Sequence, residues 1–258
     1  MLVADFMTHD PITIGPNDSL ETALQAMDEY SIRHLPVLDG EHLVGVLSQR
    51  DLLGLTGWGL LGPDDDEEER PRWVEQAMKT DVVTVSPDDL VVAAAVEVSA
   101  RGIGCLPVVA DGKLCGIVSE MDLVRLVSKD GPSGETIVSI GALHAIAVTP
   151  GATLAQLDNL MSAKGVRHLP VEEGDDLVGL VSDRDVRRAI GAGLSPDTPA
   201  ELFMTQNVVS VPAEMPLKDA AAMMFDRRIG ALVIRTDQGF GIVTTTDLLD
   251  YALGVLGG

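Results

Sequence analysis

Apolar positions along the chain follow two alternating spacings in a fixed order, and that order occurs four times. In the first copy, residues 11–14 form an extended segment, residues 20–27 show helical spacing, and residues 35–47 give two apolar strands around a turn. A further helix then begins after Ser48. The pattern therefore predicts strand, helix, strand, strand, helix. A unit this small leaves an apolar face uncovered, so we expect it to pair with another copy.

The four copies are most alike over their last twenty residues. This segment reads IRHLPVLDGEHLVGVLSQRD at 32–51, IGCLPVVADGKLCGIVSEMD at 103–122, VRHLPVEEGDDLVGLVSDRD at 166–185 and, one residue shorter, IGALVIRTDQGFGIVTTTD at 229–247. A short leading segment opens each copy. The interval from it to the final aspartate is 44, 44, 44 and 43 residues, measured from Met7 to Asp51, Met78 to Asp122, Gly141 to Asp185 and Met204 to Asp247. Successive copies begin 71, 63 and 63 residues apart, measured between Met7, Met78, Gly141 and Met204. A period of this length indicates duplicated small domains rather than a solenoid.

The boundaries between copies follow from local composition. Residues 64–69 are six consecutive acids, which is typical of a solvated linker, although an acidic tether with a function of its own is an alternative. Residues 131–134 read GPSG, a boundary signal. We therefore expect repeat one at 1–57, an acidic linker at 58–73, repeat two at 74–130, repeat three at 131–192 and repeat four at 193–258. Repeat three departs from the others, with Gly141-Ala142 where they have methionine followed by threonine or lysine.

Every copy ends with Ser or Thr followed three residues later by Asp. We call these segments corners one to four, at 48–51, 119–122, 182–185 and 244–247. A Ser/Thr at the end of a strand with an acid three residues on is typical of a helix start, and a helix start presents free backbone N–H groups to which phosphate can bind. The same pair of residues can equally be a helix cap with no ligand.

The charge balance restricts the partners. The formal net charge is −22, from 40 acidic against 18 basic residues, and only five of the basic residues are lysine. This balance repels nucleic acid, and an aromatic content of 3% also argues against base stacking. A high-salt cytoplasm explains an acidic surface with few lysines, and a merely acidic mesophilic protein is the alternative. No apolar run is long enough to span a membrane and no secretory signal is visible, so we expect a cytoplasmic protein.

Cysteine and histidine give no sign of a metal site. The five histidines show no ligand spacing with one another or with the cysteines, so we predict no metal. Both cysteines flank the hairpin of repeat two. Counting back from its turn puts Cys115 opposite Val108 and Cys105 opposite Val118, so they are not cross-strand partners. We expect free thiols.

These motifs together resemble the cystathionine-β-synthase (CBS) domain: a leading methionine, an LPV strand, and a glycine-containing strand that ends in Ser/Thr-x-x-Asp. The resemblance covers almost the whole chain in four copies. It implies an α/β fold of four β-α-β-β-α repeats, paired into two Bateman modules at 1–130 and 131–258. It also implies clefts between paired repeats that bind adenosine-containing ligands such as AMP, ADP, ATP, S-adenosylmethionine or, at times, NAD. Such modules usually act as regulatory sensors and need no cofactor of their own.

The resemblance also implies a role for particular residues. The hydroxyl of each corner is expected to contact phosphate and the acid to hold the ribose hydroxyls, in the pairs Ser48 and Asp51, Ser119 and Asp122, Ser182 and Asp185, and Thr244 and Asp247. First-strand hydroxyls approach the nucleoside in the family, and those positions are Thr13, Thr84 and Ser210, with Ala147 breaking the pattern in repeat three. Basic residues concentrate in repeats one and three, at Arg33, His34 and Arg50 and at Arg167, His168 and Arg184. We expect these two clusters to bind phosphate, with surface ion pairs or a satisfied strand histidine as the alternatives.

Two classes of function remain open. The first is a sensor of adenosine ligands, with AMP, ADP, ATP or S-adenosylmethionine as partner, that signals to an unidentified regulated protein. The second is a ligand-independent scaffold that mediates oligomerisation or protein docking. Either is expected to form a homodimer or a self-associated Bateman disc. An enzyme is the least favoured class, because no nucleophile–base pair, phosphate loop or metal set is visible and no catalytic residue is predicted.

Overall fold

The computed structural model describes residues 1–54, 71–130, 134–141, 144–237 and 239–256. Its residues divide into two compact units, one formed by Met1–Leu123 with the C-terminal residues from Leu253, the other by Val124–Ala252. The acidic block at 64–69, the boundary residues 131–133 and Ala142 lie outside the described residues. The repeat and module boundaries expected from composition stay predictions.

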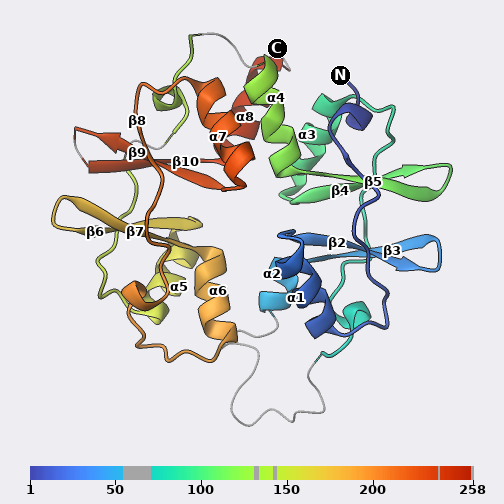
Figure 1. Ribbon diagram of the computed structural model, residues 1–258, viewed down its shortest axis with the longest axis horizontal. Coiled ribbons are helices and arrows are strands. Elements are labelled where there is room, and N and C mark those ends of the chain that lie inside the picture. The colour runs from blue at the N-terminus through green and yellow to red at the C-terminus, as the bar shows by residue number, and fades with distance from the viewer. Residues whose placement is uncertain (55–70, 131–133, 142–143, 238, 257–258) are drawn as a thin grey trace. The chain divides into compact units, whose positions relative to one another are not determined.

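Within the described residues, helix, strand, strand and helix follow one another as predicted in every repeat, whereas the predicted first strand forms a strand only in repeat four (Figure 1). Repeat one contains a 3-10 turn η1 (Val3–Asp5), β1 (Thr8–His9), α1 (Leu20–Glu29), β2 (His34–Asp39), β3 (His42–Ser48) and α2 (Gln49–Gly54). Repeat two contains η3 (Val74–Gln76), α3 (Val91–Arg101), β4 (Cys105–Ala110), β5 (Lys113–Ser119) and α4 (Glu120–Asp130). Repeat three contains η4 (Ile137–Ser139), α5 (Leu154–Lys164), β6 (His168–Glu173), β7 (Asp176–Ser182) and α6 (Asp183–Gly191). Repeat four contains η5 (Ala200–Leu202), β8 (Ser210–Pro212), α7 (Leu217–Arg227), β9 (Ala231–Thr236), β10 (Gly239–Thr244) and α8 (Thr245–Leu256).

In three of the four repeats, the first strand is shorter than the sequence predicts. In repeat four, β8 pairs in parallel with β9, and Val233 N–H donates to the Val209 carbonyl at 3.3 Å. The position of Val233 is the proline of the LPV motif in the other repeats. Because proline has no N–H, this bond cannot form there. A single parallel bridge remains in each of them, Ile14 with Val37, Val85 with Val108 and Val148 with Val171.

Within each unit the repeats pair by exchanging their leading segments. In the first unit, Thr8 of repeat one pairs with Ile117 in β5, and Lys79 of repeat two bridges to Val46 in β3. In the second unit, Thr205 of repeat four bridges to Leu180 in β7, and Ala145 N–H of repeat three donates to the Phe240 carbonyl at 2.9 Å. The expected pairing of repeats is therefore present within the described residues of both units.

A methionine sulfur packs against a strand glycine wherever this exchange involves a leading methionine. An ideal Cβ on Gly45 would lie 2.6 Å from the Met78 sulfur, and one on Gly116 would lie 2.6 Å from the Met7 sulfur. A Cβ on Gly179 would likewise clash with the Met204 sulfur. The glycine of the second hairpin strand is thus required by the close approach of the partner repeat's methionine.

The missing residue of the fourth copy corresponds to a missing irregularity in its hairpin. In repeat one the register shifts after Val37, which pairs with Gly45, so that Leu38 pairs with Leu43 and Val44 is left without a partner in the ladder. Repeats two and three show the same shift, whereas β9 and β10 pair without interruption. The extra residue of the longer copies is therefore a β-bulge.

This bulge corrects the predicted cysteine register. Cys105 lies opposite Ser119 rather than Val118, and Val108 lies opposite Gly116 rather than Cys115. Cys115 is the bulged residue, and its thiol donates to the Val108 carbonyl at 3.3 Å. Counting back from the turn was wrong by one residue because it assumed an unbroken ladder. The conclusion that both thiols are free is confirmed.

The core of each repeat lies between its hairpin and its two helices. In repeat one, Leu35, Val37 and Leu47 of the hairpin are fully buried and cluster with Ala23 and Met27 of α1. A matching cluster joins α5, α6 and the hairpin of repeat three. Each cluster also takes a buried residue from the other repeat of its pair, Val74 in the first unit and Ala200 in the second. Pairing therefore completes the core as well as the sheet.

Candidate functional site

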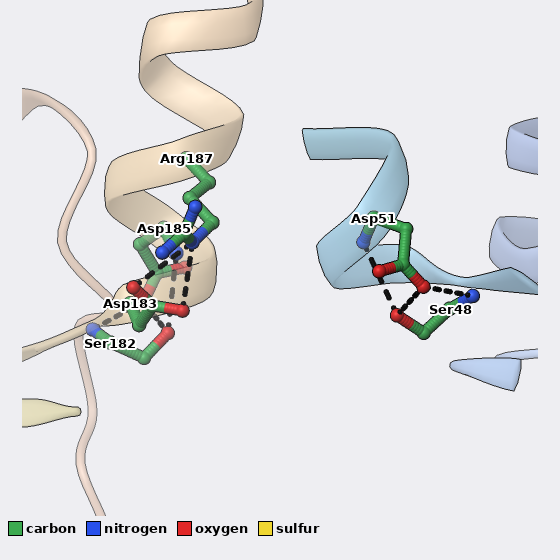
Figure 2. Close-up of polar contacts among 6 residues, drawn as sticks. All are labelled: Ser48, Asp51, Ser182, Asp183, Asp185 and Arg187. Atoms are coloured by element: carbon green, nitrogen blue, oxygen red, sulfur yellow. Dashed lines mark hydrogen bonds and ion pairs between the residues drawn. The ribbon is translucent and has the colours of Figure 1, made fainter. Parts of the chain in front are cut away.

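All four corners have the same internal geometry, because the aspartate side chain bonds back to the hydroxyl residue. In corner one the Ser48 N–H and Oγ both donate to Asp51 Oδ2, at 3.0 and 2.5 Å (Figure 2). The corresponding distances are 2.8 and 2.6 Å in corner two, 2.8 and 2.6 Å in corner three, and 2.7 and 2.7 Å in corner four. In corners one, three and four the aspartate N–H also donates to the hydroxyl oxygen, at 3.2, 3.3 and 3.4 Å. Each corner is thus a helix cap.

The cap leaves part of each carboxylate for other contacts. Both bonds in a corner end on Oδ2, so the cap does not use Oδ1. The four aspartates are half-buried at the start of α2, α4, α6 and α8. A carboxylate held at a helix start with one oxygen not engaged by the cap can accept hydroxyl donors from a bound molecule. The capping interpretation and the ligand interpretation are therefore compatible in one side chain.

The residue before each LPV strand joins the corner through its backbone. The N–H of the first residue after the corner hydroxyl donates to the carbonyl of Arg33, Gly104, Arg167 and Gly230, at 2.8, 3.1, 2.9 and 3.1 Å. The next residue along, His34 in repeat one and His168 in repeat three, lies opposite the corner serine, Ser48 or Ser182, in the hairpin ladder. The hairpin ladder therefore brings the histidines and serines predicted from the sequence together.

The arginines before the LPV strands, by contrast, act on residues of the paired repeat. Arg167 Nη2 donates to Thr246 Oγ1 at 2.6 Å, which places a repeat-three guanidinium in the first turn of α8, in corner four. In the first unit, burial raises the pKa of the Cys105 thiol to about 12, while Arg33 lowers it and the nearby Glu120 and Asp122 raise it. Arg33 of repeat one and the acids of corner two thus act on the same thiol. Sequence reasoning assigned Arg33 and Arg167 to clusters within their own repeats, where Arg50 and Arg184 occupy exposed positions in the first turns of α2 and α6.

A packing contact explains why repeat two lacks an arginine at this position. An ideal Cβ on Gly104 would clash with the imidazole of His34, and one on Gly230 would lie 4.0 Å from His168 Nε2. The glycines lie at the positions of Arg33 and Arg167 in the even repeats. Gly104 leaves room for His34 of repeat one, so in the first unit the two repeats differ where their side chains meet.

Lys79 is a basic residue that sequence reasoning did not assign to the site. Its Nζ lies 3.9 Å from Asp51 Oδ1, the carboxylate oxygen that the cap does not use. Its position next to Met78 in the leading segment of repeat two is visible in the sequence. The exchange that brings this segment to corner one is not visible there, because no local pattern shows which repeat a leading segment joins.

The remaining predicted residues have no described contact with a corner. Thr13 and Thr84 are exposed beside the bridge of the first strand, and Ser210 is half-buried in β8, opposite Val233. Ala147, which replaces the hydroxyl in repeat three, is half-buried. In α6 an ion pair joins Arg187 Nε to Asp183 Oδ2 at 2.9 Å (Figure 2).

The described residues also bear on two other kinds of site. Within ranges 1–54, 71–130, 134–141, 144–237 and 239–256, no three histidine, cysteine or acidic residues come together as metal ligands. In the same ranges, no helix combines the length and the apolar content that crossing a bilayer requires.

The chain consists of four repeats that pair by exchanging their leading segments, and each repeat ends in a capped strand-to-helix corner. This organisation defines a class of duplicated α/β modules. The CBS domain family matches residues 3–56, 74–129, 140–192 and 200–254, and the chain belongs to this family. The recognition made from the motifs is confirmed. The predicted fold of four α/β repeats is confirmed as well.

Known proteins share this organisation. An uncharacterised protein of Methanocaldococcus jannaschii, MJ1225, is 24% identical over 265 residues, which cover 93% of this chain and 94% of the relative. Its crystal structure, described as that of a candidate archaeal homologue of g-AMPK, superposes with a TM-score of 0.80 at 23% identity, covering 98% of this chain and 100% of that one. At this identity the likeness concerns the fold. The CBS domain-containing protein YhcV of Bacillus subtilis is 31% identical over 114 residues, 44% of this chain and 81% of the relative.

Proposed function

We propose that this protein is a regulatory sensor that binds adenosine-containing ligands at its capped corners, between paired repeats, and communicates their presence to a partner protein. Membership of the CBS family implies a regulatory role without catalysis. The observation that carries the proposal is the geometry of the corners, where a fixed, half-buried carboxylate keeps one oxygen out of the cap four times over. A carboxylate accepts both hydroxyls of a ribose, which distinguishes a ribonucleoside from a neutral apolar ligand.

The phosphate of such a ligand needs positive charge, which is scarce in a chain with a net charge of −22. Arg167 supplies it at corner four, where its guanidinium already contacts Thr246. By the same logic we assign Arg33 to corner two, since Arg33 and Asp122 both act electrostatically on the Cys105 thiol. We therefore assign the phosphate-binding role of these arginines to the corner of the paired repeat. The hydroxyls of Ser48, Ser119, Ser182 and Thr244 donate to the corner aspartates, so the further attraction for a phosphate at each corner comes from the positive end of the helix dipole.

Ligand binding reaches the partner through the packing of a pair. The leading segment of one repeat lies on the hairpin of the other and contributes a buried residue to its core. A ligand that contacts both repeats consequently favours one arrangement of the pair over another, and binding shifts the population of states. The output then passes to a regulated protein or to self-association as a homodimer or disc.

The test is calorimetry on the full chain with AMP, ADP, ATP, NAD and S-adenosylmethionine, in a high-salt buffer that screens the acidic surface. We expect at least one of them to bind. Arg167→Ala should weaken ATP and ADP more than adenosine, whereas Arg227→Ala, an exposed arginine in the last turn of α7, should change none of them. A folded chain that releases no heat with any of the ligands would overturn the proposal in favour of the ligand-independent scaffold.

A further inference from the structure

The position after the leading methionine is charged in one repeat of the four. It is Lys79 in repeat two, Thr8 in repeat one, Thr205 in repeat four and Ala142 in repeat three. The three that the structure describes meet the same point of the paired hairpin, since Lys79 lies opposite Val46, Thr8 opposite Ile117 and Thr205 opposite Leu180. A residue at this position therefore approaches the corner of the paired repeat, and for Lys79 that is corner one.

The backbone of Lys79 is held firmly in this place. Val46 N–H donates to the Lys79 carbonyl at 3.0 Å, and Lys79 N–H donates to the Val46 carbonyl at 2.9 Å. The preceding Met78 packs its sulfur against Gly45. The side chain starts from a fixed point but remains mobile, because 74% of its surface is exposed.

The ammonium of Lys79 lies beside the oxygen that a ribose would use. Nζ is 3.9 Å from Asp51 Oδ1, while the Ser48 bonds hold Oδ2, and the Asp51 side chain is only 18% exposed. An ion pair with one highly exposed partner is weak, because water screens the two charges. Ribose hydroxyls can therefore replace the ammonium on Oδ1 at little cost, and the ammonium stays close to whatever group the ribose carries.

We propose that Lys79 is a specificity-determining residue of corner one, which makes this corner select adenosine ligands that carry phosphate over uncharged adenosine and over S-adenosylmethionine. The inference rests on the proposed function and names the ligand class of one of its sites. A phosphate on the ribose brings negative charge to the ammonium, whereas the sulfonium of S-adenosylmethionine brings positive charge. At corners two and three, the residue of the leading segment equivalent to Lys79 is threonine. These corners therefore lack the preference for phosphate-carrying ligands that Lys79 provides.

The experiment compares ligands that differ in charge on variants of the full chain. Adenosine, AMP, ATP and S-adenosylmethionine are titrated calorimetrically into the wild type, Lys79→Thr, Lys79→Arg and Lys113→Thr. The threonine variant copies the residue of repeats one and four. Lys113 is the matched control, because it is an exposed strand lysine that pairs with Glu41 at 2.6 Å, away from every corner. The binding event of corner one is the one that Asp51→Asn removes.

We expect Lys79→Thr to lower ATP affinity at corner one about tenfold and to leave adenosine within about twofold. Lys79→Arg should retain the preference, and Lys113→Thr should leave all ligands unchanged. The salt dependence of ATP binding should also weaken in Lys79→Thr, since one cation–phosphate interaction is lost. A merely structural lysine would lower all affinities together and leave the ratio between ligands unchanged.

The outcomes separate this inference from the proposal beneath it. An unchanged ratio of ATP to adenosine affinity in Lys79→Thr overturns the role of Lys79 and leaves the sensor intact. If Asp51→Asn removes no binding event, corner one is not a ligand site and the inference fails, while the other corners still support a sensor. If the wild type binds none of the four ligands, the proposed function fails and the inference fails with it.

Discussion

Asp185 of corner three combines a cap with a proposed ligand contact, and two substitutions separate these roles. Its Oδ2 accepts from Ser182 N–H and Oγ at 2.8 and 2.6 Å. Asp185→Ala removes both acceptor contacts and should cost about 1–3 kcal/mol of the free energy of unfolding. Asp185→Asn keeps an acceptor oxygen and loses only the charge at the helix start, which is worth about 0.3–1 kcal/mol.

The effect on ligand binding should follow the charge and not the cap. A hydrogen bond to a charged acceptor is worth about 1–1.5 kcal/mol more than one to a neutral acceptor, so for two ribose hydroxyls the affinity should fall about 30- to 150-fold. We therefore expect Asp185→Asn to lose most of the affinity at this corner that Asp185→Ala loses, although it keeps more of the stability.

The assay pairs thermal unfolding with calorimetry. At about 2–4 °C per kcal/mol for a chain of this size, the alanine variant should melt several degrees below the asparagine variant. Asp219→Asn is the control, because it removes an exposed acid from the first turn of α7 outside any corner. A 2′-deoxy ligand should bind the wild type more weakly and lose little further in Asp185→Asn. If Asp185→Asn binds every ligand as the wild type does, the carboxylate is a cap and nothing more.

Three further predictions concern the fold, the thiols and the acidic surface. Gly45→Ala should lower the free energy of unfolding in urea by about 1–3 kcal/mol, because the new Cβ would meet the Met78 sulfur at 2.6 Å and the Lys79 carbonyl at 3.1 Å. Gly151→Ala is the control, because its Cβ would enter open space and should change little. Equal effects of the two substitutions would contradict the packing of Met78 against Gly45. Burial raises the folded-state pKa of Cys105 to about 12 from 9.0, so the unfolded chain loses its thiol proton at lower pH than the folded chain. The free energy of unfolding should therefore fall between about pH 9 and pH 12, by up to about 1.4 kcal/mol per pH unit. The Cys105→Ala variant should lack this pH-dependent loss. The net charge of −22 should make the melting temperature rise from low to molar potassium chloride, and a melting temperature that is flat or falls with salt would argue against a high-salt origin.

Much of the site could be predicted from the sequence, because its signals are local. The hydroxyl and acid of each corner are three residues apart, and a helix start places such a pair in contact whatever surrounds it. The bulge is local as well but was missed in the cysteine register, since a β-bulge leaves no composition signal in the strand. The deletion in repeat four was its one visible trace, as β9 and β10 show.

What could not be predicted are the contacts made across a pair. Arg167 meets Thr246, separated from it by 79 residues, and Lys79 meets Asp51 through a leading segment that joins the other repeat. The sequence grouped Arg33 and Arg167 with the basic residues of their own repeats, because neighbours in the chain were the only guide. The glycines opposite His34 and His168 acquire their meaning only when the two repeats face each other.

The sequence by itself determined the number of repeats, their order of strands and helices, the capped corners and the family, since each depends on spacing within a few tens of residues. Only the tertiary structure decided which repeat supplies the charge at which corner. The physical reason is that the leading segments and arginines cross to the paired repeat, where sheet pairing and steric room, not distance along the chain, fix their neighbours.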